Sequence, residues 1–398
     1  MMTYFTGYRC SNCGAEYSPE DLIYLCPVCA RDYKAGMPLP GILECVYDYE
    51  GIARAWAEFN IAFPAAHEAK RMEELCEIFC PVDKEYFPNL PVGKTPLVCS
   101  QSLAGETLHL KFDGLNPSGS LKDRASQLVV AEAKRLGMRE IVAASTGNAA
   151  SSLAAICAAA GLKAVIFAPA AAPEAKLVQI KVHGAKLNLV DGSYDDAFAA
   201  ALNYGKDHDC LNRNTAYHPF TIEGKKTAGL ELFVQMESVP DYIFIPTGDG
   251  VILCGMAKAF SDLQKTGLID KVPVLVAAQA ESSDAITSYW ESGVYGDANQ
   301  ARTIADSICV KTPSAAHLAL RVLQDSEGFG IRLTDEEILS AQKMLAERSG
   351  LFCEPSSAAT LAAYFNCREQ GKIKDKASVV LMLTGHGLKD VQAVKFAD

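Results

Sequence analysis

Residues 116–124 have the sequence Asn-Pro-Ser-Gly-Ser-Leu-Lys-Asp-Arg, which places one lysine, Lys122, in a turn of small residues. The alternating segment Leu108–Phe112 predicts a strand before the turn, and the apolar positions after Arg124 predict a helix that begins near the lysine. Backbone N–H groups at a helix N-terminus disfavour an ammonium ion and favour a neutral amine or a bound anion. A lysine with a lowered pKa can condense with an aldehyde cofactor, and an exposed lysine in a Ser/Gly turn is the alternative interpretation.

Three further segments complete a set of four motifs. They are Ala-Ser-Thr-Gly-Asn-Ala-Ala-Ser at 144–151, Pro-Thr-Gly-Asp-Gly at 246–250 and Leu-Thr-Gly-His-Gly-Leu-Lys-Asp at 383–390. Together with residues 116–124 they resemble, in the same order, motifs of the threonine synthase family, whose cofactor-lysine pattern is N-P-[ST]-G-S-[FL]-K-D-R. The resemblance covers essentially the whole chain. It implies a pyridoxal 5′-phosphate enzyme of the tryptophan-synthase-β class.

The resemblance also implies a role for individual residues. Lys122 is expected to form the Schiff base with the cofactor, and Asn148 is expected to pair with the cofactor's 3′-oxygen. Ser145 and Thr146 are expected to hold the substrate carboxylate, and Thr384 is expected to face the pyridine nitrogen. A threonine hydroxyl can donate a hydrogen bond to that nitrogen but cannot keep it protonated, which favours elimination and replacement over transamination. A further segment, Glu-Pro-Ser-Ser-Ala-Ala at 354–359, matches a family segment that could line the site.

The segment that follows residue 246 predicts an anion-binding turn. An apolar strand at 242–246 leads into a glycine-containing loop and then into a helix at 251–263, so backbone N–H groups should converge at the start of that helix. The resemblance assigns the cofactor phosphate to this loop, which consists of Thr247, Gly248, Asp249, Gly250 and Val251. Asp249 stands where many relatives carry asparagine, and a carboxylate beside a phosphate must be paired or point away. We therefore expect its backbone to matter more than its side chain.

Four cysteines near the N-terminus form a separate unit. Cys10 and Cys13 make one CxxC pair, and Cys26 and Cys29 make a second pair after twelve intervening residues. Two tight turns with this spacing can present four thiolates to a zinc ion, and a site filled by four protein ligands is structural. Free or disulfide-bonded thiols in a degenerate ribbon are the alternative. Many members of the threonine synthase family carry a similar ribbon.

Composition is consistent with an enzyme of two cored domains. The chain has 398 residues, 49% of them apolar and 21% charged, with a net charge of −11. This balance argues against a nucleic-acid footprint, and no basic helix suggests a membrane surface. We identify no signal peptide at 1–11, and the longest apolar stretch, 153–162, is too short to span a bilayer. Fourteen cysteines fit a reducing compartment, so we expect a cytoplasmic protein.

Apolar strands that alternate with helix-length segments predict an α/β fold with parallel-rich, twisted sheets flanked by helices. The Ala-rich segment at 149–160 predicts a helix buried against a sheet. The resemblance implies the two-domain type II pyridoxal-phosphate fold and a homodimer. It places a ribbon-like segment at 1–40, a large cofactor-binding domain at 41–124 and 219–398, and a small mobile domain at 125–218. The predicted strands lie at 43–49, 108–112, 141–144, 164–168, 186–190, 242–246, 274–278 and 379–383.

One segment departs from the family pattern where the substrate is expected. Residues 218–227 are His-Pro-Phe-Thr-Ile-Glu-Gly-Lys-Lys-Thr, whereas family members commonly have N-P-[YF]-R-[IL]-E-G-Q-K-T, and their arginine contacts the substrate phosphate. Thr221 stands in place of this arginine, and a hydroxyl cannot neutralise a phosphate. Arg213, Asn214 and Thr215 are candidates to compensate. Alternatively, the small amino-acid substrate lacks a phosphate.

Three functions follow from these residues. The first is threonine synthase, a lyase that converts O-phosphohomoserine and water into threonine and phosphate through a Schiff base at Lys122. The second is a related replacement or ammonia-lyase enzyme of the cysteate synthase, diaminopropionate ammonia-lyase or serine/threonine dehydratase type, which Thr221 favours. The third is an inactive binding or regulatory subunit, which the presence of Lys122, Asn148 and Thr384 argues against.

Overall fold

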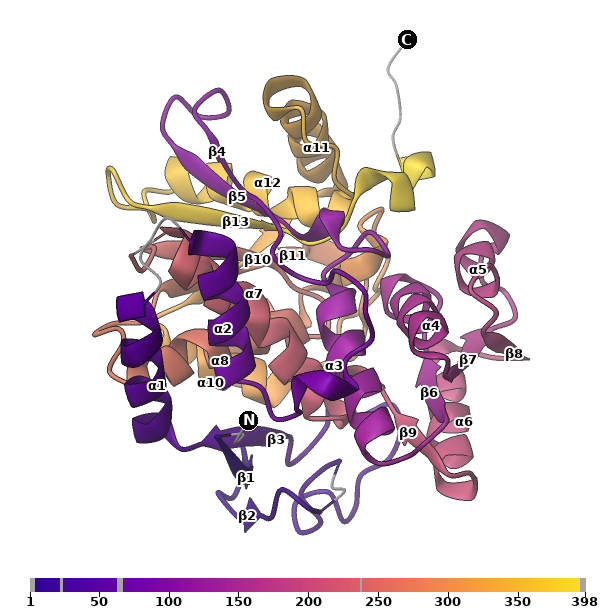
Figure 1. The fold of residues 1–398 in the computed structure, drawn as a ribbon. Helices are drawn as coiled ribbons and strands as arrows, with labels where there is room; N and C mark the ends of the chain where they lie inside the picture. The colour runs from indigo at the N-terminus through magenta and orange to yellow at the C-terminus, as the bar shows by residue number, and fades with distance from the viewer. Residues whose placement is uncertain (1–3, 22–23, 63–66, 237, 394–398) are drawn as a thin grey trace.

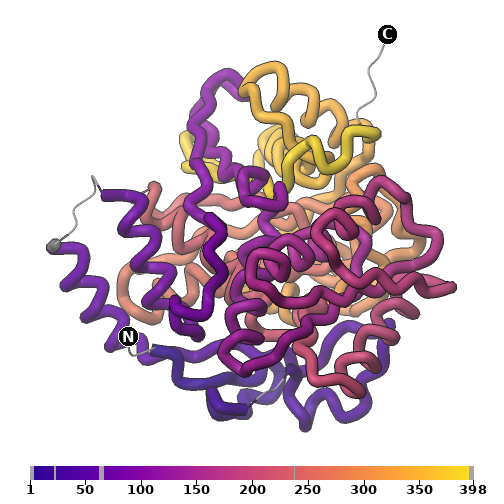
Figure 2. The backbone as a smooth tube through the Cα atoms, turned by 45° about the vertical axis from the view of Figure 1, so that its right-hand side comes forward, coloured from indigo at the N-terminus to yellow at the C-terminus, as the bar shows by residue number. Residues whose placement is uncertain are grey.

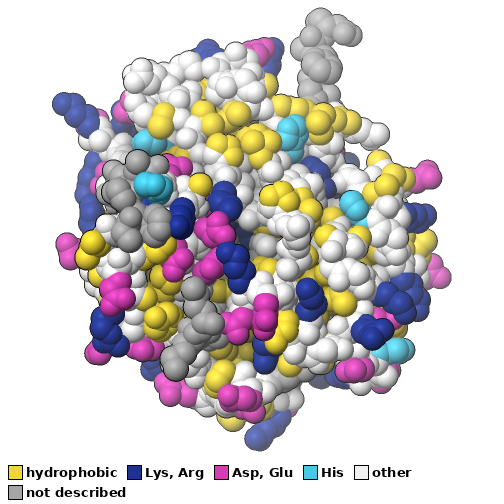
Figure 3. Space-filling view, viewed as in Figure 1, with side chains coloured by type: hydrophobic (Ala, Val, Ile, Leu, Met, Phe, Trp, Pro, Cys, Tyr) yellow, Lys and Arg dark blue, Asp and Glu magenta, His cyan; other side chains and the backbone are white. Residues whose placement is uncertain are grey.

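The computed structural model describes residues 4–21, 24–62, 67–236 and 238–393. Within them the chain forms three β-sheets, with helices packed between and around them (Figure 1). None of the helices in these residues is long and apolar enough to cross a membrane. Acidic and basic side chains are interspersed over the face seen in Figure 3, unlike the basic stripe of a nucleic-acid-binding surface.

The largest sheet has six strands in the order β12-β11-β10-β13-β5-β4, and all neighbours are parallel except β4 and β5. Every residue of β10 and β13 is buried, because the strands are continuous apolar runs and helices cover both faces of the sheet. In Figure 1, α7, α8 and α10 lie below this sheet, and α12, with α11 packed on it, lies above. The strands are β4 Leu97–Ser100, β5 Leu108–Phe112, β10 Tyr242–Pro246, β11 Val274–Ala280, β12 Phe329–Leu333 and β13 Val379–Leu383. The helices are α7 Phe220–Met236, α8 Val251–Lys265, α9 Ala285–Ser292, α10 Ala316–Asp325, α11 Asp335–Ser349 and α12 Pro355–Glu369.

A second, fully parallel sheet has the order β8-β7-β6-β9. Helix α6 packs on β6 and β7, and α4 packs on β7 and on α5. Helix α3 packs on both α4 and α7, so it joins the helices of the two parallel sheets. The strands are β6 Glu140–Ala144, β7 Lys163–Pro169, β8 Lys186–Val190 and β9 Cys210–Asn212. The helices are α3 Lys122–Arg135, α4 Asn148–Ala160, α5 Glu174–Lys181 and α6 Tyr194–Asp207.

The N-terminal segment forms a small antiparallel sheet in the order β2-β1-β3, followed by two helices. The sheet lies along the bottom of the molecule in Figures 1 and 2, and the two helices stand on the left of Figure 1. The backbone N–H of Leu39 donates to the carbonyl of Ser314, and the hydroxyl of Tyr24 accepts the N–H of Asn212 at 3.0 Å. The segment therefore contacts the regions of both the six-stranded and the four-stranded sheet. Its elements are β1 Phe5–Cys10, β2 Glu16–Tyr17, β3 Leu43–Tyr47, α1 Tyr49–Ala62 and α2 Glu68–Ile78.

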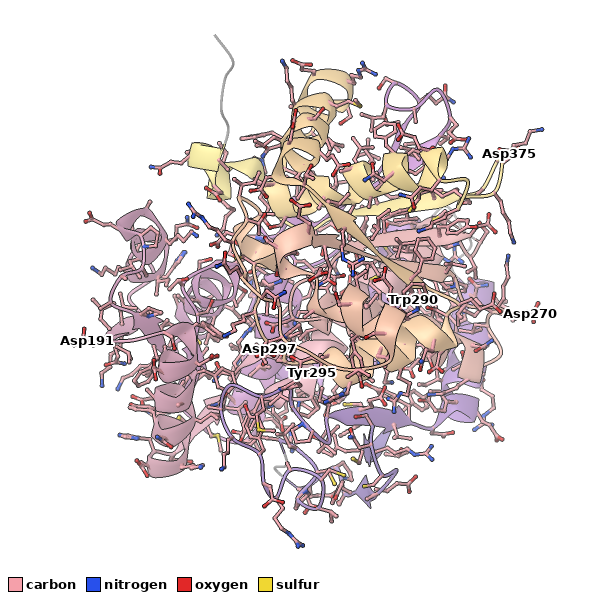
Figure 4. All side chains as sticks on the ribbon, turned by 180° about the vertical axis from the view of Figure 1, so that it is seen from behind. Asp191, Asp270, Trp290, Tyr295, Asp297 and Asp375 are labelled. Atoms are coloured by element: carbon pink, nitrogen blue, oxygen red, sulfur yellow. The ribbon has the colours of Figure 1, made fainter. Side chains whose placement is uncertain are left out.

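The rear face of the molecule is seen in Figure 4. Tyr295 and Asp297 lie close together near the centre of this view, with Trp290 farther to the right, and the Tyr295 hydroxyl donates to Asp297 at 2.7 Å. Asp191, which follows β8, marks the outer edge of the four-stranded sheet on the opposite side of this view. The six-stranded and four-stranded sheets therefore occupy separate halves of the molecule.

Most predicted elements are confirmed. The strands at 108–112, 186–190, 242–246 and 379–383 have the predicted bounds, and α4 is the predicted Ala-rich helix, with most of its side chains buried. Five strands, β1, β2, β4, β9 and β12, were not predicted. Among them, β2 has only two residues, β9 has three, and β12 carries Gly330 and Arg332 among its five residues. The four-stranded sheet, at 140–212, lies inside the range proposed for the small domain. The domain limits themselves stay a prediction.

Candidate active site

Lys122 is the first residue of α3, at the carboxyl edge of the six-stranded sheet. The preceding turn is attached to the end of β13 by two backbone hydrogen bonds, Leu121 N–H to Thr384 O at 2.8 Å and His386 N–H to Gly119 O at 2.9 Å. Gly119 has a φ of +82°, which an L side chain rarely adopts. Burial lowers the pKa of the Lys122 amine, Glu354 opposes this change, and Arg213 adds to it.

A buried ion network fixes the first turn of α3. The guanidinium of Arg124 donates to Asp113 at 2.6 Å and to Glu231 at 2.7 Å, and Lys111 donates to Glu231 at 2.7 Å. These side chains are almost fully buried, and such pairs hold a single geometry because each charge depends on its partner. The network positions the helix that carries Lys122 relative to β5 and α7.

Asn148 begins α4, directly after the loop that contains Ser145 and Thr146. Its amide donates to Glu354 at 2.8 Å and to Ser307 at 3.1 Å. Burial raises the pKa of the Glu354 carboxyl, while the bond from Asn148 and the charge of Lys122 act against this rise. Asn148 and Lys122 therefore both interact with the Glu354 carboxyl group, Asn148 by a hydrogen bond and Lys122 by its charge.

Thr384 directly follows β13, and its side chain is buried. Its hydroxyl lies 3.3 Å from the hydroxyl of Ser357, which accepts the N–H of Gly385 at 2.9 Å. A Cβ at Gly385 would overlap the Glu354 carboxylate, so glycine is needed for this close approach. Thr384, Glu354 and Lys122 thus belong to one layer at the carboxyl ends of β5 and β13.

The glycine loop joins β10 to α8. Gly250 has a φ of +80° and precedes α8 without a side-chain cap, which leaves the N–H groups of the first turn for another acceptor. A Cβ at Gly248 would lie 2.9 Å from the Ile308 Cα, so a side chain is excluded there. The Asp249 carboxylate accepts the Ser314 N–H at 3.1 Å, so it is paired, as expected.

The expected substrate residues follow β9. Asn214 accepts the Ala144 N–H at 2.6 Å, and its buried Nδ2 has no hydrogen-bond partner among the described residues. Thr215 has a φ of +30°, and its buried hydroxyl has no partner in the same part of the chain. The Thr221 hydroxyl instead donates to the carbonyl oxygens of Thr215 and His218. Asn214 and Thr215 therefore keep free polar atoms for a ligand, whereas Thr221 is already bonded.

A cleft opens where these segments meet. An ion pair across it joins Lys176 to Asp306 at 2.7 Å, and Lys389 donates to Ser118 O and Ser151 Oγ at 2.9 Å each. Residues from both parallel-sheet regions therefore form its walls. The lining consists of Thr146, Gly147, Asn148, Lys176, Gln179, Asp306, Ser307, Glu354, Pro355, Ser356, Lys389 and Asp390.

A family model described as pyridoxal-phosphate dependent enzyme matches residues 89–385. The chain belongs to this pyridoxal-phosphate family. Curated relatives named threonine synthase include those of Methanosarcina acetivorans and Methanocaldococcus jannaschii, each 34% identical over 394 residues, which cover 97% of this chain and 93% of the relative. The threonine synthase of Bacillus sp. is 35% identical over 323 residues, which cover 77% of this chain and 89% of that protein. The resemblance stated from the motifs is confirmed.

Solved structures of the pyridoxal-phosphate family share the fold. Serine racemase from Dictyostelium discoideum has a TM-score of 0.64 at 27% identity, over 74% of this chain and 92% of that one. Threonine deaminase isoform 2 from Solanum lycopersicum has a TM-score of 0.65 at 20% identity, over 76% and 84%. The predicted α/β fold of the type II pyridoxal-phosphate enzymes is confirmed.

The residues present fit pyridoxal 5′-phosphate. The half-buried amine of Lys122 has a lowered pKa, which suits condensation with an aldehyde. The first turn of α8 offers uncapped N–H groups beside Gly248 and Gly250, which suits a phosphate. Arg213 lies in the same region, and its buried Nη2 has no hydrogen-bond partner among the described residues, as expected of a group that awaits an anion.

Three residues of the site carry little or no signal in the sequence. Glu354 lies in the 354–359 segment that matches the family, but nothing in that match indicates its contact with Asn148. Ser307 lies in no motif, and the Gly-Leu-Lys-Asp segment that contains Lys389 does not by itself indicate a role for the lysine. Their place in the site can be recognised only in the folded structure, where all three line the same cleft.

The four ribbon cysteines converge on one point. Their sulfur atoms all lie within 4.8 Å of one another, with 3.8 Å between Cys10 and Cys29 and 3.7 Å between Cys13 and Cys26. All four are free thiols, and the Tyr17 hydroxyl lies 3.0 Å from the Cys26 sulfur. The cluster can hold a metal ion.

Proposed function

We propose that this protein is a threonine synthase, which converts O-phosphohomoserine and water into threonine and phosphate. The observation that carries the proposal is the convergence of Lys122, Asn148 and Thr384 in one site, in a chain whose curated relatives over 97% of its length are named threonine synthase. The reaction removes protons from the α and β carbons, expels phosphate from the γ carbon and adds water at the β carbon. Bound pyridoxal 5′-phosphate supplies the electron sink that these steps require.

We assign the proton transfers to Lys122. Because burial lowers the pKa of its amine, a larger fraction is neutral near neutral pH than for an exposed lysine. A neutral amine can take a proton from one substrate carbon and return it to another. The buried network of Arg124 keeps the helix that carries Lys122 in place during this transfer.

We assign the substrate carboxylate to the N-terminus of α4. Gly147 precedes the helix without a side-chain cap, so the N–H groups of the first turn remain available to an anion. Ser145 and Thr146 lie in the same loop and add hydroxyl donors. Asn148 is held by Glu354, and this bond keeps its amide directed into the cleft.

A second candidate function is a replacement or ammonia-lyase enzyme that acts on an amino acid without a phosphate. The Thr221 hydroxyl, which stands where relatives commonly carry the phosphate-binding arginine, donates to backbone carbonyls and offers no positive charge. Cysteate synthase, diaminopropionate ammonia-lyase and serine/threonine dehydratase are the types this observation favours.

A substrate panel separates the two functions. Purified protein loaded with pyridoxal 5′-phosphate is assayed with O-phosphohomoserine, O-phosphoserine, serine, threonine and diaminopropionate. Release of phosphate and threonine from O-phosphohomoserine supports threonine synthase. Turnover of another substrate with none of O-phosphohomoserine rejects it in favour of the second candidate.

The lysine assignment has its own test. The loaded protein should show the visible absorption band of lysine-bound cofactor, and Lys122→Ala should lose this band. Lys343→Ala, at an exposed position of α11, is the matched control and should keep it. A Lys122→Ala protein with the original band would remove the assignment.

We also propose that the four cysteines bind a structural zinc ion. Four free thiols within 4.8 Å and two CxxC pairs support a tetrahedral site that protein ligands fill completely. Metal analysis of reduced protein should give one zinc per chain, and Cys26→Ser should lower this content.

We further propose a cytoplasmic homodimer. The free state of all fourteen cysteines is consistent with a reducing compartment. Light scattering of purified protein tests the assembly, and a mass of one chain would contradict it.

A further inference from the structure

Two neighbouring lysines on α7 have opposite surroundings. Lys226 forms ion pairs with Glu223 and with Asp262, the latter at 3.1 Å. Lys225 is just as deeply buried, with 3% of its surface exposed, yet it forms no ion pair within the described residues. Its ammonium donates only to a neutral group, the backbone carbonyl of Thr221, at 3.3 Å. A buried cation without a counter-ion is costly, so Lys225 requires an explanation.

The position of Lys225 is fixed by the packing of α7 on α8. A Cβ on Gly255, in the second turn of α8, would lie only 2.8 Å from the Lys225 Cβ, so glycine allows the two helices to approach here. The Lys225 stem therefore lies against the beginning of α8, directly after the glycine loop. Burial holds the pKa of Lys225 well below its usual value, Arg213 and Lys122 add to this effect, and Asp249 opposes it.

Arg213 is a second buried cation in the same place. Its Nε donates to Ser126 at 3.3 Å, whereas its buried Nη2 has no hydrogen-bond partner among the described residues. Burial lowers its pKa to about 10, and the Asp123 carboxylate opposes this change. An arginine with an unused buried N–H group can make a further charged hydrogen bond at little extra cost.

The nearby carboxylates do not neutralise these two cations by direct contact. Asp249 accepts the Ser314 N–H at 3.1 Å, and Asp123 accepts the Ser118 N–H at 2.7 Å. Neither forms an ion pair with Arg213 or Lys225. Lys225 packs against α8, and Arg213 is close enough to Lys122 and Lys225 to lower the pKa of both. Two basic side chains without a counter-ion therefore lie near the uncapped N–H groups of α8, and a bound anion of charge −2 would favour their protonated forms.

We propose that Lys225 and Arg213 bind a phosphate ester dianion at the start of α8, and that Lys225 also offsets the charge of Asp249 in the glycine loop. The ligand is the phosphate of the cofactor or the phosphate of the substrate, and in the latter case the proposal rests on the proposed function. The sequence has one added positive charge and one added negative charge in this site, at positions where the family pattern has neutral residues. Lys225 stands where the family pattern has glutamine, one helical turn from Thr221, and Asp249 stands where many relatives have asparagine.

The first arm of the test measures cofactor binding to apoprotein. Dissociation constants for pyridoxal 5′-phosphate and for pyridoxal, which lacks the phosphate, are compared in wild type, Lys225→Gln and the exposed control Lys343→Gln. If the cofactor phosphate is the ligand, Lys225→Gln weakens pyridoxal 5′-phosphate binding by at least about tenfold and leaves pyridoxal binding unchanged.

The second arm uses the loaded protein and inorganic phosphate. If the substrate phosphate is the ligand, Lys225→Gln keeps cofactor affinity but weakens inhibition by inorganic phosphate by at least about tenfold. Equal affinities in both arms for wild type, Lys225→Gln and Lys343→Gln would overturn the proposal. Such a result would not contradict the proposed threonine synthase function. Conversely, a weakened phosphate site in a protein that does not turn over O-phosphohomoserine rejects only the proposed function.

A double-mutant cycle tests the pairing with Asp249. Lys225→Gln leaves the Asp249 charge uncompensated, so adding Asp249→Asn should recover most of the lost phosphate affinity. Additive losses in the double variant would overturn the pairing. If Lys225→Gln does not fold, Arg213→Gln takes its place in both arms, and phosphate affinities equal to those of wild type would overturn the proposal.

Discussion

The Asn148 amide donates to the Glu354 carboxylate at 2.8 Å, and this single bond joins the first residue of α4 to the residue that precedes α12. The two residues are 206 positions apart in the chain. Helix α4 packs on the four-stranded sheet and α12 packs on the six-stranded sheet. The bond therefore spans the cleft between the regions of these two sheets. It also directs a buried carboxylate toward the lysine on which the proposed chemistry depends.

Removal of this bond should cost stability and activity together. Asn148→Ala leaves Glu354 with a weaker contact from Ser307 at 3.3 Å, so we expect the free energy of unfolding to fall by about 1–3 kcal/mol. Urea unfolding of the apoprotein measures this change. Ser307→Ala is the matched control and should cost less, because its bond to Glu354 is longer. A greater loss in Ser307→Ala than in Asn148→Ala would contradict this view of the cleft.

The same carboxyl group should make stability depend on pH. Burial raises the pKa of Glu354, so the folded state holds this proton more tightly than the unfolded state. The stability it contributes is complete below the unfolded pKa, about 4.3, and is lost as pH rises through the folded pKa. Glu354→Gln carries no such charge. The difference in unfolding free energy, Glu354→Gln minus wild type, should therefore increase as pH rises from about 4. Urea unfolding of the apoproteins at a series of pH values checks the sign, and a difference that falls with pH would exclude this role.

If the four cysteines bind zinc as proposed, its removal should affect the distant substrate segment. The Tyr24 ring stacks on Tyr217 at 4.7 Å, and its hydroxyl accepts the Asn212 N–H. These contacts hold both ends of the segment that carries Arg213, Asn214 and Thr215. If chelation costs about 1 kcal/mol of positioning, KM for the amino-acid substrate should rise about fivefold, with a smaller change in kcat.

Two variants separate this effect from general unfolding. Tyr24→Ala should raise KM while the zinc content stays unchanged, and Tyr24→Phe should have a smaller effect because it keeps the ring stack. Metal-free protein with an unchanged KM would show that the ribbon does not position the segment.

The sequence predicted the parts of this fold that depend on local pattern. Strands such as β10 and β13 are continuous apolar runs, and the CxxC spacing and the glycine loop are local as well. The partners of buried charges are not local. Lys225 and Lys226 are adjacent, yet Lys226 pairs with two carboxylates whereas Lys225 donates to the backbone carbonyl of Thr221. They differ because successive helical residues point about 100° apart. The contact of Asn148 with Glu354 depends in the same way on how two distant helices meet.

Thr221 provides the clearest distinction between a structural and a substrate-binding residue. Its buried hydroxyl donates to the carbonyl oxygens of Thr215 and His218, so it closes the turn that begins α7. Thr221→Val keeps the shape and removes these bonds, so we expect a loss of about 1–2 kcal/mol in unfolding free energy. Thr221→Ser keeps the hydroxyl and should lose less.

Substrate affinity decides between the two roles of Thr221. If the hydroxyl serves the backbone, KM for the phosphorylated substrate should change no more in Thr221→Val than KM for an unphosphorylated amino acid. A Thr221→Val protein of wild-type stability, with KM raised for the phosphorylated substrate alone, would instead assign the hydroxyl to the phosphate. The first result is expected because the carbonyl oxygens already take the only proton that Thr221 can donate.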